Sequence, residues 1–155
     1  DIDRFEQIIQ STLISGFVMS QQIAKQMVKQ QTGGKIIFIS SVHAEMPVAR
    51  SIAYGAAKAG LNHMAETMAV ELARHHINVN VIEPGWIDTP GERTLFTEEY
   101  IQEQAGKLPL GRLGTPDDIG STVAFLASSS ADYITGAILR VDGGFVHKHC
   151  RAEKS

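Results

Sequence analysis

The sequence predicts an α/β fold with a parallel sheet of the doubly wound type. Three short, β-rich apolar runs alternate with longer segments of helical periodicity along the 155 residues. This alternation is typical of parallel strands whose crossover helices cover the faces of the sheet. A doubly wound sheet normally has about six strands. We therefore expect the chain to hold about half of such a fold.

The composition and charge limit the partners that the chain is expected to have. Hydrophobic residues make up 43% and charged residues 20% of the chain, the balance of a soluble globular domain. The net charge of −3 argues against nucleic acid or an anionic membrane, because neutralising phosphates needs a basic face. No apolar run approaches the roughly 18 residues of a membrane span, and the start lacks the pattern of a secretory signal. The single Cys150 cannot form an internal disulfide, so we expect a cytoplasmic location.

The first half of the chain has the order helix, strand, helix. Apolar residues at helical spacing predict a helix over residues 4–30, with Asp3 as its N-cap and two glycines beyond its end. Residues 35–40, "KIIFIS", lack clean alternation, as expected of a strand buried on both faces. A second apolar stripe predicts a helix over residues 52–75.

The second half begins and ends with a strand. Residues 77–85, "INVNVIEPG", predict a strand closed by a Pro-Gly turn. Residues 91–111 have a loose pattern with one short helix from Glu98. Thr115, followed by a proline and two aspartates, predicts the capped start of a strong helix. Residues 137–141, "AILRV", predict the last strand.

Ligands of doubly wound sheets bind at the carboxyl ends of the strands. We therefore expect a site formed by the residues at or just beyond those ends. These residues are Ser40, Ser41, Pro84, Gly85 and Asp142.

Tyr54 and Lys58 are spaced to share one face of the second helix. An ordinary tyrosine pKa of about 10 is too high for a group that must both donate and accept a proton near neutrality. An ammonium about 5 Å away, at an effective dielectric of about 20, contributes roughly 3 kcal/mol, or about two pKa units. We therefore predict that Lys58 lowers the pKa of Tyr54. A hydroxyl beside the phenol, with Ser41 as the candidate, would hold a substrate oxygen as its charge changes.

Together these features carry a family resemblance. In chain order they are Ser41, Tyr54 with Lys58, the Pro84–Gly85 turn, Thr89 and the closing Asp142, Gly143 and Gly144. With them the chain resembles the short-chain dehydrogenase/reductase family over nearly its whole length. The resemblance implies a Rossmann-like fold whose amino-terminal dinucleotide-binding half is missing. Residues 1–146 would form the carboxyl-terminal part of a single domain, and residues 147–155 a tail.

The resemblance implies an oxidoreductase that passes a hydride between NAD or NADP and an alcohol or carbonyl substrate. Tyr54 would be the general acid/base, Lys58 would lower its pKa and bind the nicotinamide ribose, and Ser41 would steady the substrate oxygen. Residues 91–110 would cover the substrate, and the two long helices would pair between subunits of a homodimer or homotetramer. The residues implied to bind the cofactor are Ser40, Tyr54, Lys58, Pro84, Gly85, Trp86, Ile87 and Thr89.

Two departures from the family pattern matter. Thr12 stands where members usually carry an asparagine that supports a proton relay, so the catalytic set implied here is Ser41, Tyr54, Lys58 and Thr12. The Gly-x-x-x-Gly-x-Gly turn that cradles the pyrophosphate occurs nowhere in the sequence, and the first residue is Asp1 rather than Met. We expect the chain to be a piece of a longer enzyme and to be inactive alone.

The sequence leaves more than one substrate class open. The stretch "SSVHAEMP" resembles glucose 1-dehydrogenase-like members, so Ser41, His43, Glu45 and Trp86 are candidate substrate residues in a polyol pocket. His43 and Glu45 would otherwise be exposed loop residues. A 3-ketoacyl-acyl-carrier-protein reductase is the alternative enzyme, and a truncated, non-catalytic oligomerising remnant is the alternative outside catalysis. The final "HKHC" cluster fits no standard zinc spacing, so no metal site is predicted.

Overall fold

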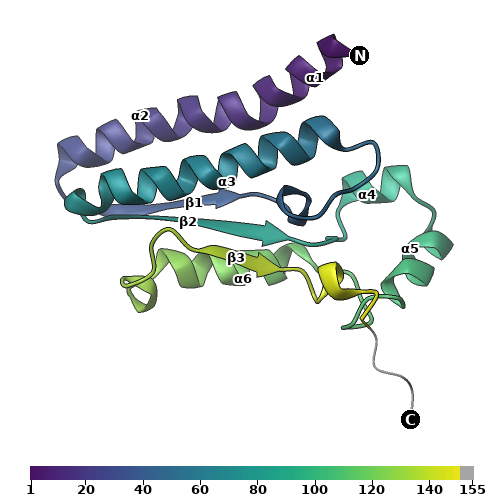
Figure 1. Ribbon diagram of the computed structural model, residues 1–155. Helices are drawn as coiled ribbons and strands as arrows, with labels where there is room; N and C mark the ends of the chain where they lie inside the picture. The colour runs from purple at the N-terminus through teal and green to yellow at the C-terminus, as the bar shows by residue number, and fades with distance from the viewer. Residues whose placement is uncertain (151–155) are drawn as a thin grey trace.

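The computed structural model describes residues 1–150 and has the expected α/β architecture. Its sheet is parallel throughout, in the order β1 (Gly34–Ile39), β2 (Ile77–Pro84) and β3 (Ile138–Val141). Two long helical segments cover one face of the sheet and α6 (Pro116–Ala127) covers the other (Figure 1). The prediction of part of a doubly wound sheet is therefore confirmed.

The first helical segment is longer than predicted and is not uniform. It consists of α1 (Ile2–Ile9), a π-helical turn over Gln10–Ile14 and α2 (Ser15–Gln30). The prediction of Asp3 as N-cap is wrong, because the Asp1 carboxylate accepts the hydrogen bond from the Arg4 amide at 3.2 Å. π-helical turns inside α-helices are often found at functional sites.

α3 (Ile52–Leu72) lies beside the first helical segment on the same face of the sheet (Figure 1), and a 3₁₀ turn over Ala73–His75 follows it. Its buried face consists mainly of small side chains, which let its backbone approach the strands closely. The fully or nearly fully buried members are Ala53, Ala57, Leu61, Ala65 and Ala69. Leu61, Ala65 and Ala69 pack against apolar side chains of β1 and β2, so the principal core holds α3 in a fixed position over the sheet.

The start of α6 agrees with its sequence signals. The Thr115 hydroxyl accepts from the Asp118 amide at 3.3 Å, and the Asp118 carboxylate accepts from the Thr115 amide at 2.7 Å. This reciprocal capping box is the pattern predicted from Thr115 and the residues after it. On the face below the sheet, the α6 residue Leu126 packs with Ile82 and Ala131 in a second buried cluster.

Two short helices lie beyond the carboxyl ends of the strands (Figure 1). α5 (Glu98–Ala105) is the short helix predicted from Glu98, whereas α4 (Pro90–Leu95) was not predicted. Its signal is the Thr89–Pro90 pair, which repeats the threonine cap and first-turn proline of α6. A helix of only six residues is too short to show apolar periodicity.

Both edges of the sheet are open within residues 1–150, because β1 and β3 each pair with β2 alone. Ile39 at the end of β1 is 44% exposed. Across the same residues, no helix combines the length and the apolar character that a bilayer span requires.

Candidate active site

Ser41 and Tyr54 come together where β1 runs into α3. Ser41 directly follows the strand and caps a 3₁₀ turn over Val42–Ala44, where its hydroxyl accepts from the His43 amide at 3.2 Å. Tyr54 lies in the first turn of α3. Ser41 and Tyr54 line the same cavity, and the interaction with the Ser41 side chain favours a lower pKa of Tyr54.

The pKa of Tyr54 nevertheless moves opposite to the prediction. Burial of the ring raises it, and this effect outweighs the lowering by Ser41; the negative charge of Glu92 raises it further. Lys58 Nζ lies 5.5 Å from the centroid of the Tyr54 ring and donates to the Ile39 carbonyl at 2.8 Å. The prediction that Lys58 lowers the Tyr54 pKa is wrong here, because the pKa is raised, with burial as the largest cause, and Lys58 is not among the groups that shift it.

Tyr54 lines a cavity of about 650 Å³ at the carboxyl end of the sheet. This volume suits a small-molecule ligand. α4 and α5 close one side of the cavity, and the loop after β2 forms its floor. Its lining residues are Ser41, Val42, His43, Val48, Ser51, Tyr54, Gly85, Trp86, Ile87, Thr89, Glu92, Leu95, Phe96, Tyr100 and Phe145.

A second hollow, of about 390 Å³, lies on the open side of β1. It is lined by Thr12 of the π-helical turn, by Lys58 and by the strand residues at 36–39, and Tyr54 lines it as well. Tyr54 is therefore shared between the two hollows, whereas Lys58 and Thr12 line only the second. Tyr54 thus connects the hollow that Ser41 lines with the hollow that Lys58 and Thr12 line.

Two of the predicted cofactor residues, Ser40 and Thr89, have structural partners. The Ser40 side chain is buried and donates to the Lys58 carbonyl at 3.4 Å, which ties the end of β1 to α3. Ser40 lines neither hollow. The Thr89 hydroxyl accepts from the Glu92 amide at 3.3 Å and so caps α4.

The turn after Pro84 requires glycine at position 85. A Cβ atom at Gly85 would lie 2.7 Å from Asp142 Cα and 2.9 Å from its carbonyl oxygen. The Gly85 amide donates to Val141 O at 3.1 Å. The turns that follow β2 and β3 are therefore in contact, and Ile87 continues the turn by bridging to Gly114.

His43 and Glu45, the candidate substrate residues, lie in different surroundings. The His43 ring meets the Tyr54 ring edge-on, with centroids 5.5 Å apart, and its Nδ1 is buried without a hydrogen-bond partner. Burial lowers the pKa of His43, so the ring is neutral at pH 7. Glu45 is exposed, pairs with Arg140 of β3 and does not line the cavity.

Sequence reasoning missed Glu92 and the aromatic wall beside it. Glu92 accepts a hydrogen bond from the indole nitrogen of Trp86 at 2.8 Å. Trp86, Phe96 and Tyr100 form an aromatic cluster with ring centroids 5.3 to 6.3 Å apart. The available signal for Glu92 was its position three residues after Thr89, the spacing of a helix start.

The buried pair of Glu83 and Asn62 was also not predicted from the sequence. Glu83 on β2 is fully buried, and its Oε1 accepts from Asn62 Nδ2 of α3 at 2.6 Å. Its Oε2 has no hydrogen-bond partner. Burial raises the pKa of Glu83, although the Asn62 hydrogen bond lowers it in part. This pair connects the strand before the Gly85 turn to the helix that carries Tyr54.

Comparison with known proteins identifies the family. The sequence model of a family described as Enoyl-(Acyl carrier protein) reductase matches residues 1–146. The chain belongs to the short-chain dehydrogenase/reductase family. 3-oxoacyl-acyl-carrier-protein reductase MabA of Mycobacterium tuberculosis is 38% identical over 148 residues, which are 95% of this chain and 59% of MabA. The chain thus spans about three fifths of this relative.

Two solved structures of family members show the same fold. Acetoin dehydrogenase YohF from Salmonella typhimurium superposes with a TM-score of 0.85 at 38% identity, covering 96% of this chain and 57% of YohF. A 4-hydroxyisoleucine dehydrogenase mutant complexed with NADH and succinate gives a TM-score of 0.89 at 31% identity, covering 95% of this chain and 61% of that protein. NAD(P)H is the cofactor class of the family, as the resemblance implied.

The residues present fit one end of this cofactor. Lys58 and Tyr54 offer a cationic and a hydroxyl donor at the open side of β1, and Gly85 lines the cavity at the adjoining strand end. These groups suit a nicotinamide ribose. The glycine-rich turn that would hold the pyrophosphate does not occur in the 155 residues.

Proposed function

We propose that the protein transfers a hydride between NAD(P) and the alcohol or carbonyl group of a small hydroxylated substrate, such as a sugar. One observation carries the proposal. The Tyr54 phenol, with the Ser41 hydroxyl beside it, lines a substrate-sized cavity and also the neighbouring hollow that contains Lys58. A proton-exchanging group between two such sites is what coupled proton and hydride transfer needs.

Each side chain has a role that follows from its position. Ser41 donates a hydrogen bond to the substrate oxygen, and Tyr54 gives that oxygen a proton or removes one. Because burial raises the pKa of Tyr54, the phenol is protonated at neutral pH and acts as a proton donor, which favours carbonyl reduction. Lys58 binds the ribose hydroxyls, and the nicotinamide, when bound, supplies or accepts the hydride.

The experiment that tests the proposal removes one oxygen atom. Tyr54→Phe keeps the edge-on ring contact with His43 but cannot transfer a proton. In the protein expressed from its complete gene, we expect kcat to fall by about 10² to 10⁴, the usual contribution of general acid–base catalysis, with cofactor affinity nearly unchanged. Tyr133→Phe is the matched control, since Tyr133 is fully exposed. Near-normal turnover of Tyr54→Phe would reject the assignment.

Reduction of a 3-oxoacyl thioester is the second candidate. It is favoured by the similarity to MabA and by the aromatic wall of the cavity, which suits an acyl chain. A panel that compares glucose with a 3-oxoacyl thioester, followed by the absorbance of the reduced cofactor, separates the two. The candidate with the higher kcat/KM is retained.

We also propose that the 155 residues alone are inactive. A truncated protein of this length would keep only the surface through which subunits associate. The open edge of β1 and the lack of a glycine-rich turn support this proposal. Enhancement of NAD(P)H fluorescence by the isolated 155-residue chain would contradict it.

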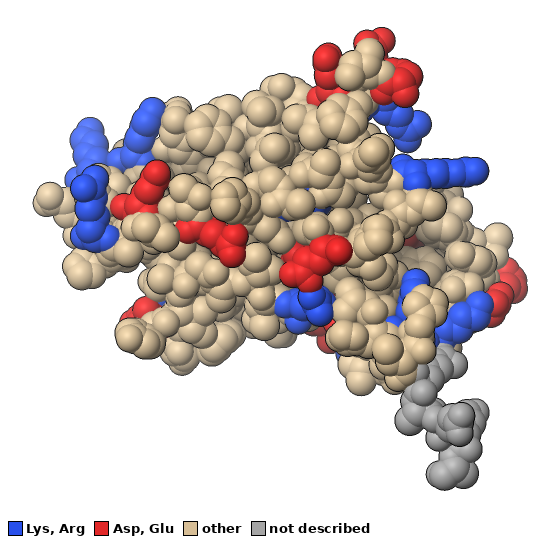
Figure 2. All heavy atoms as spheres, viewed as in Figure 1, with Lys and Arg blue, Asp and Glu red and all other residues tan. Residues whose placement is uncertain are grey.

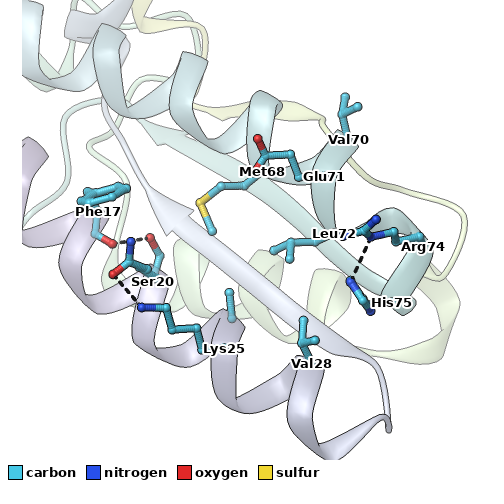
Figure 3. Close-up of a pocket in the computed structure, with 12 residues that line it drawn as sticks. Phe17, Ser20, Lys25, Val28, Met68, Val70, Glu71, Leu72, Arg74 and His75 are labelled. Carbon is cyan, nitrogen blue, oxygen red and sulfur yellow. Dashed lines mark hydrogen bonds between the residues drawn. The ribbon is translucent and has the colours of Figure 1, made fainter.

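A homo-oligomer is proposed to form across α2 and α3. A groove of about 830 Å³ runs between these helices, with Phe17 and Val28 on one side and Met68 and Leu72 on the other (Figure 3). In Figure 2 the surface over α2 is mostly uncharged, with charged groups gathered towards its ends. Val70, beside the groove, is 80% exposed. A second copy of the chain would cover these apolar groups.

Light scattering tests this interface. We expect Val70→Asp to lower the molar mass of the complete protein to that of a smaller assembly. Ile2→Asp, at an exposed apolar residue outside the groove, is the control and should leave the mass unchanged. An unchanged mass in Val70→Asp would place the interface elsewhere.

A further inference from the structure

The cavity beside Tyr54 carries a negative charge that no neighbouring group neutralises. Within residues 1–150, Glu92 is the only acidic residue that lines it, and neither lysine nor arginine does. His43 is neutral at pH 7 because burial lowers its pKa. An ionised substrate group would therefore face Glu92 without a compensating cation.

The surroundings of Glu92 differ from those of the nearby carboxylates. Asp88 and Glu98 both bind the Arg93 guanidinium, which lies next to Glu92 in sequence. Glu92 takes no part in an ion pair in the described chain. Its one side-chain hydrogen bond comes from the Trp86 indole at 2.8 Å, which uses Oε2 and leaves Oε1 free for a ligand.

The charge of Glu92 acts on the reacting end of the cavity. It raises the pKa of Tyr54 and opposes the lowering of the His43 pKa, so it acts on both rings. The wall around it is aromatic, with Trp86 and Phe96 in edge-on contact at 5.5 Å. A carboxylate acceptor next to aromatic faces suits a ligand with hydroxyl groups and an apolar C–H surface.

We infer that Glu92 is a specificity-determining residue, which admits uncharged, hydroxyl-bearing substrates and rejects those that carry a carboxylate or phosphate. This inference rests on the proposed function. Glu92 accepts a hydrogen bond from a substrate hydroxyl through Oε1 and repels an anionic group at the same position. Two unit charges about 6 Å apart, at an effective dielectric of about 20, repel strongly enough to change kcat/KM about a hundredfold.

The test uses pairs of substrates that differ only by a carboxylate in place of a hydroxymethyl group. D-glucose with D-glucuronate is one pair, and 1,3-butanediol with 3-hydroxybutyrate is the other. We expect the complete protein to prefer the neutral member of a pair about a hundredfold in kcat/KM. Glu92→Gln keeps the size of the side chain and an acceptor for Trp86, and it should reduce this preference at least tenfold. Glu99→Gln removes the same charge from an exposed position outside the cavity and should leave the preference unchanged.

The outcomes separate the inference from the proposed function. Two results overturn the inference and leave the proposed function standing. In the first, the wild-type protein turns over the anionic member of a pair better than the neutral one. In the second, Glu92→Gln prefers the neutral member as strongly as the wild type does. No turnover of any substrate, including the acyl thioester, overturns the proposed function and the inference with it. If Glu92→Gln does not fold, Glu92→Asp is measured in its place. This variant keeps the negative charge, so it must keep the preference for the neutral substrate. The wild-type preference must also shrink as salt is raised from about 0.05 to about 0.5 M.

Discussion

Removal of the Asn62 amide tests how the helix that carries Tyr54 is fixed to the sheet. Asn62 is 6% exposed and Glu83 is 0% exposed, and their side chains meet at 2.6 Å. The nearest cation, Arg140 Nε, lies 3.9 Å from Glu83 Oε2, beyond hydrogen-bonding distance. Asn62→Ala therefore leaves a buried carboxyl group with no hydrogen bond.

The expected loss follows from the charge of that group. A hydrogen bond to a charged group contributes about 1.5 to 3 kcal/mol, so Asn62→Ala should lower the free energy of unfolding by about 2 to 3 kcal/mol at pH 8. Burial raises the pKa of Glu83 above its ordinary value of 4.5. The stability that a group with a raised pKa contributes is complete below the unfolded pKa and is lost as the pH rises through the folded pKa. The hydrogen bond from Asn62 reduces this loss of stability at high pH. Asn62→Ala must therefore lower the free energy of unfolding more at pH 8 than near pH 4.5.

Urea denaturation followed by circular dichroism, at about pH 5 and pH 8, measures the effect. The midpoint should fall more at pH 8, with an unchanged m-value. His63→Ala, which alters the exposed neighbour on the same helix, should change the free energy of unfolding by less than about 0.5 kcal/mol. A loss of equal size at both pH values would show that the carboxylate charge is not involved and would refute the reasoning.

Two further changes probe the site. Gly85→Ala places a Cβ atom 2.7 Å from the Asp142 backbone, which cannot yield as a flexible side chain would; we expect a loss of about 1 to 3 kcal/mol in thermal or urea denaturation, and an unaltered midpoint would contradict the contact between the two turns. Thr12→Asn introduces the usual family residue into the hollow that Lys58 also lines. We expect kcat of the complete protein to be maintained or raised. A large loss of kcat would show that Thr12 does not occupy the relay position.

Features set by neighbours in sequence were predicted well from the residues alone. The start of α6 follows from Thr115 and the residues after it, because a helix cap is a local interaction. Tyr54 and Lys58 share a face because helical geometry fixes their spacing. The same local signal was present at Thr89, and α4 was missed only because it is so short. The displaced N-cap at Asp1 is a difference of two residues, which is common at helix ends.

Features set by contacts between distant segments were not predicted. Lys58 is anchored by the Ile39 carbonyl, 19 positions away, and no helical spacing indicates that bond. The pKa of Tyr54 depends on burial by several segments, which reverses the sign expected from Lys58 alone. Three glutamates look alike in sequence, yet Glu45 is exposed, Glu83 is fully buried and Glu92 faces the cavity. Only the fold assigns them these places.

The pH dependence of kcat/KM for carbonyl reduction, measured on the complete protein, tests most directly whether Tyr54 is the proton donor. Because burial raises the pKa of Tyr54 above its ordinary value of 10.0, the phenol stays protonated through neutral pH. The account predicts a constant rate from about pH 6 to about pH 9 and a fall only at higher pH. A rate that falls as the pH rises through a value below 6.5, the direction in which burial moves the pKa of His43, would instead identify the imidazole as the donor and contradict the central claim.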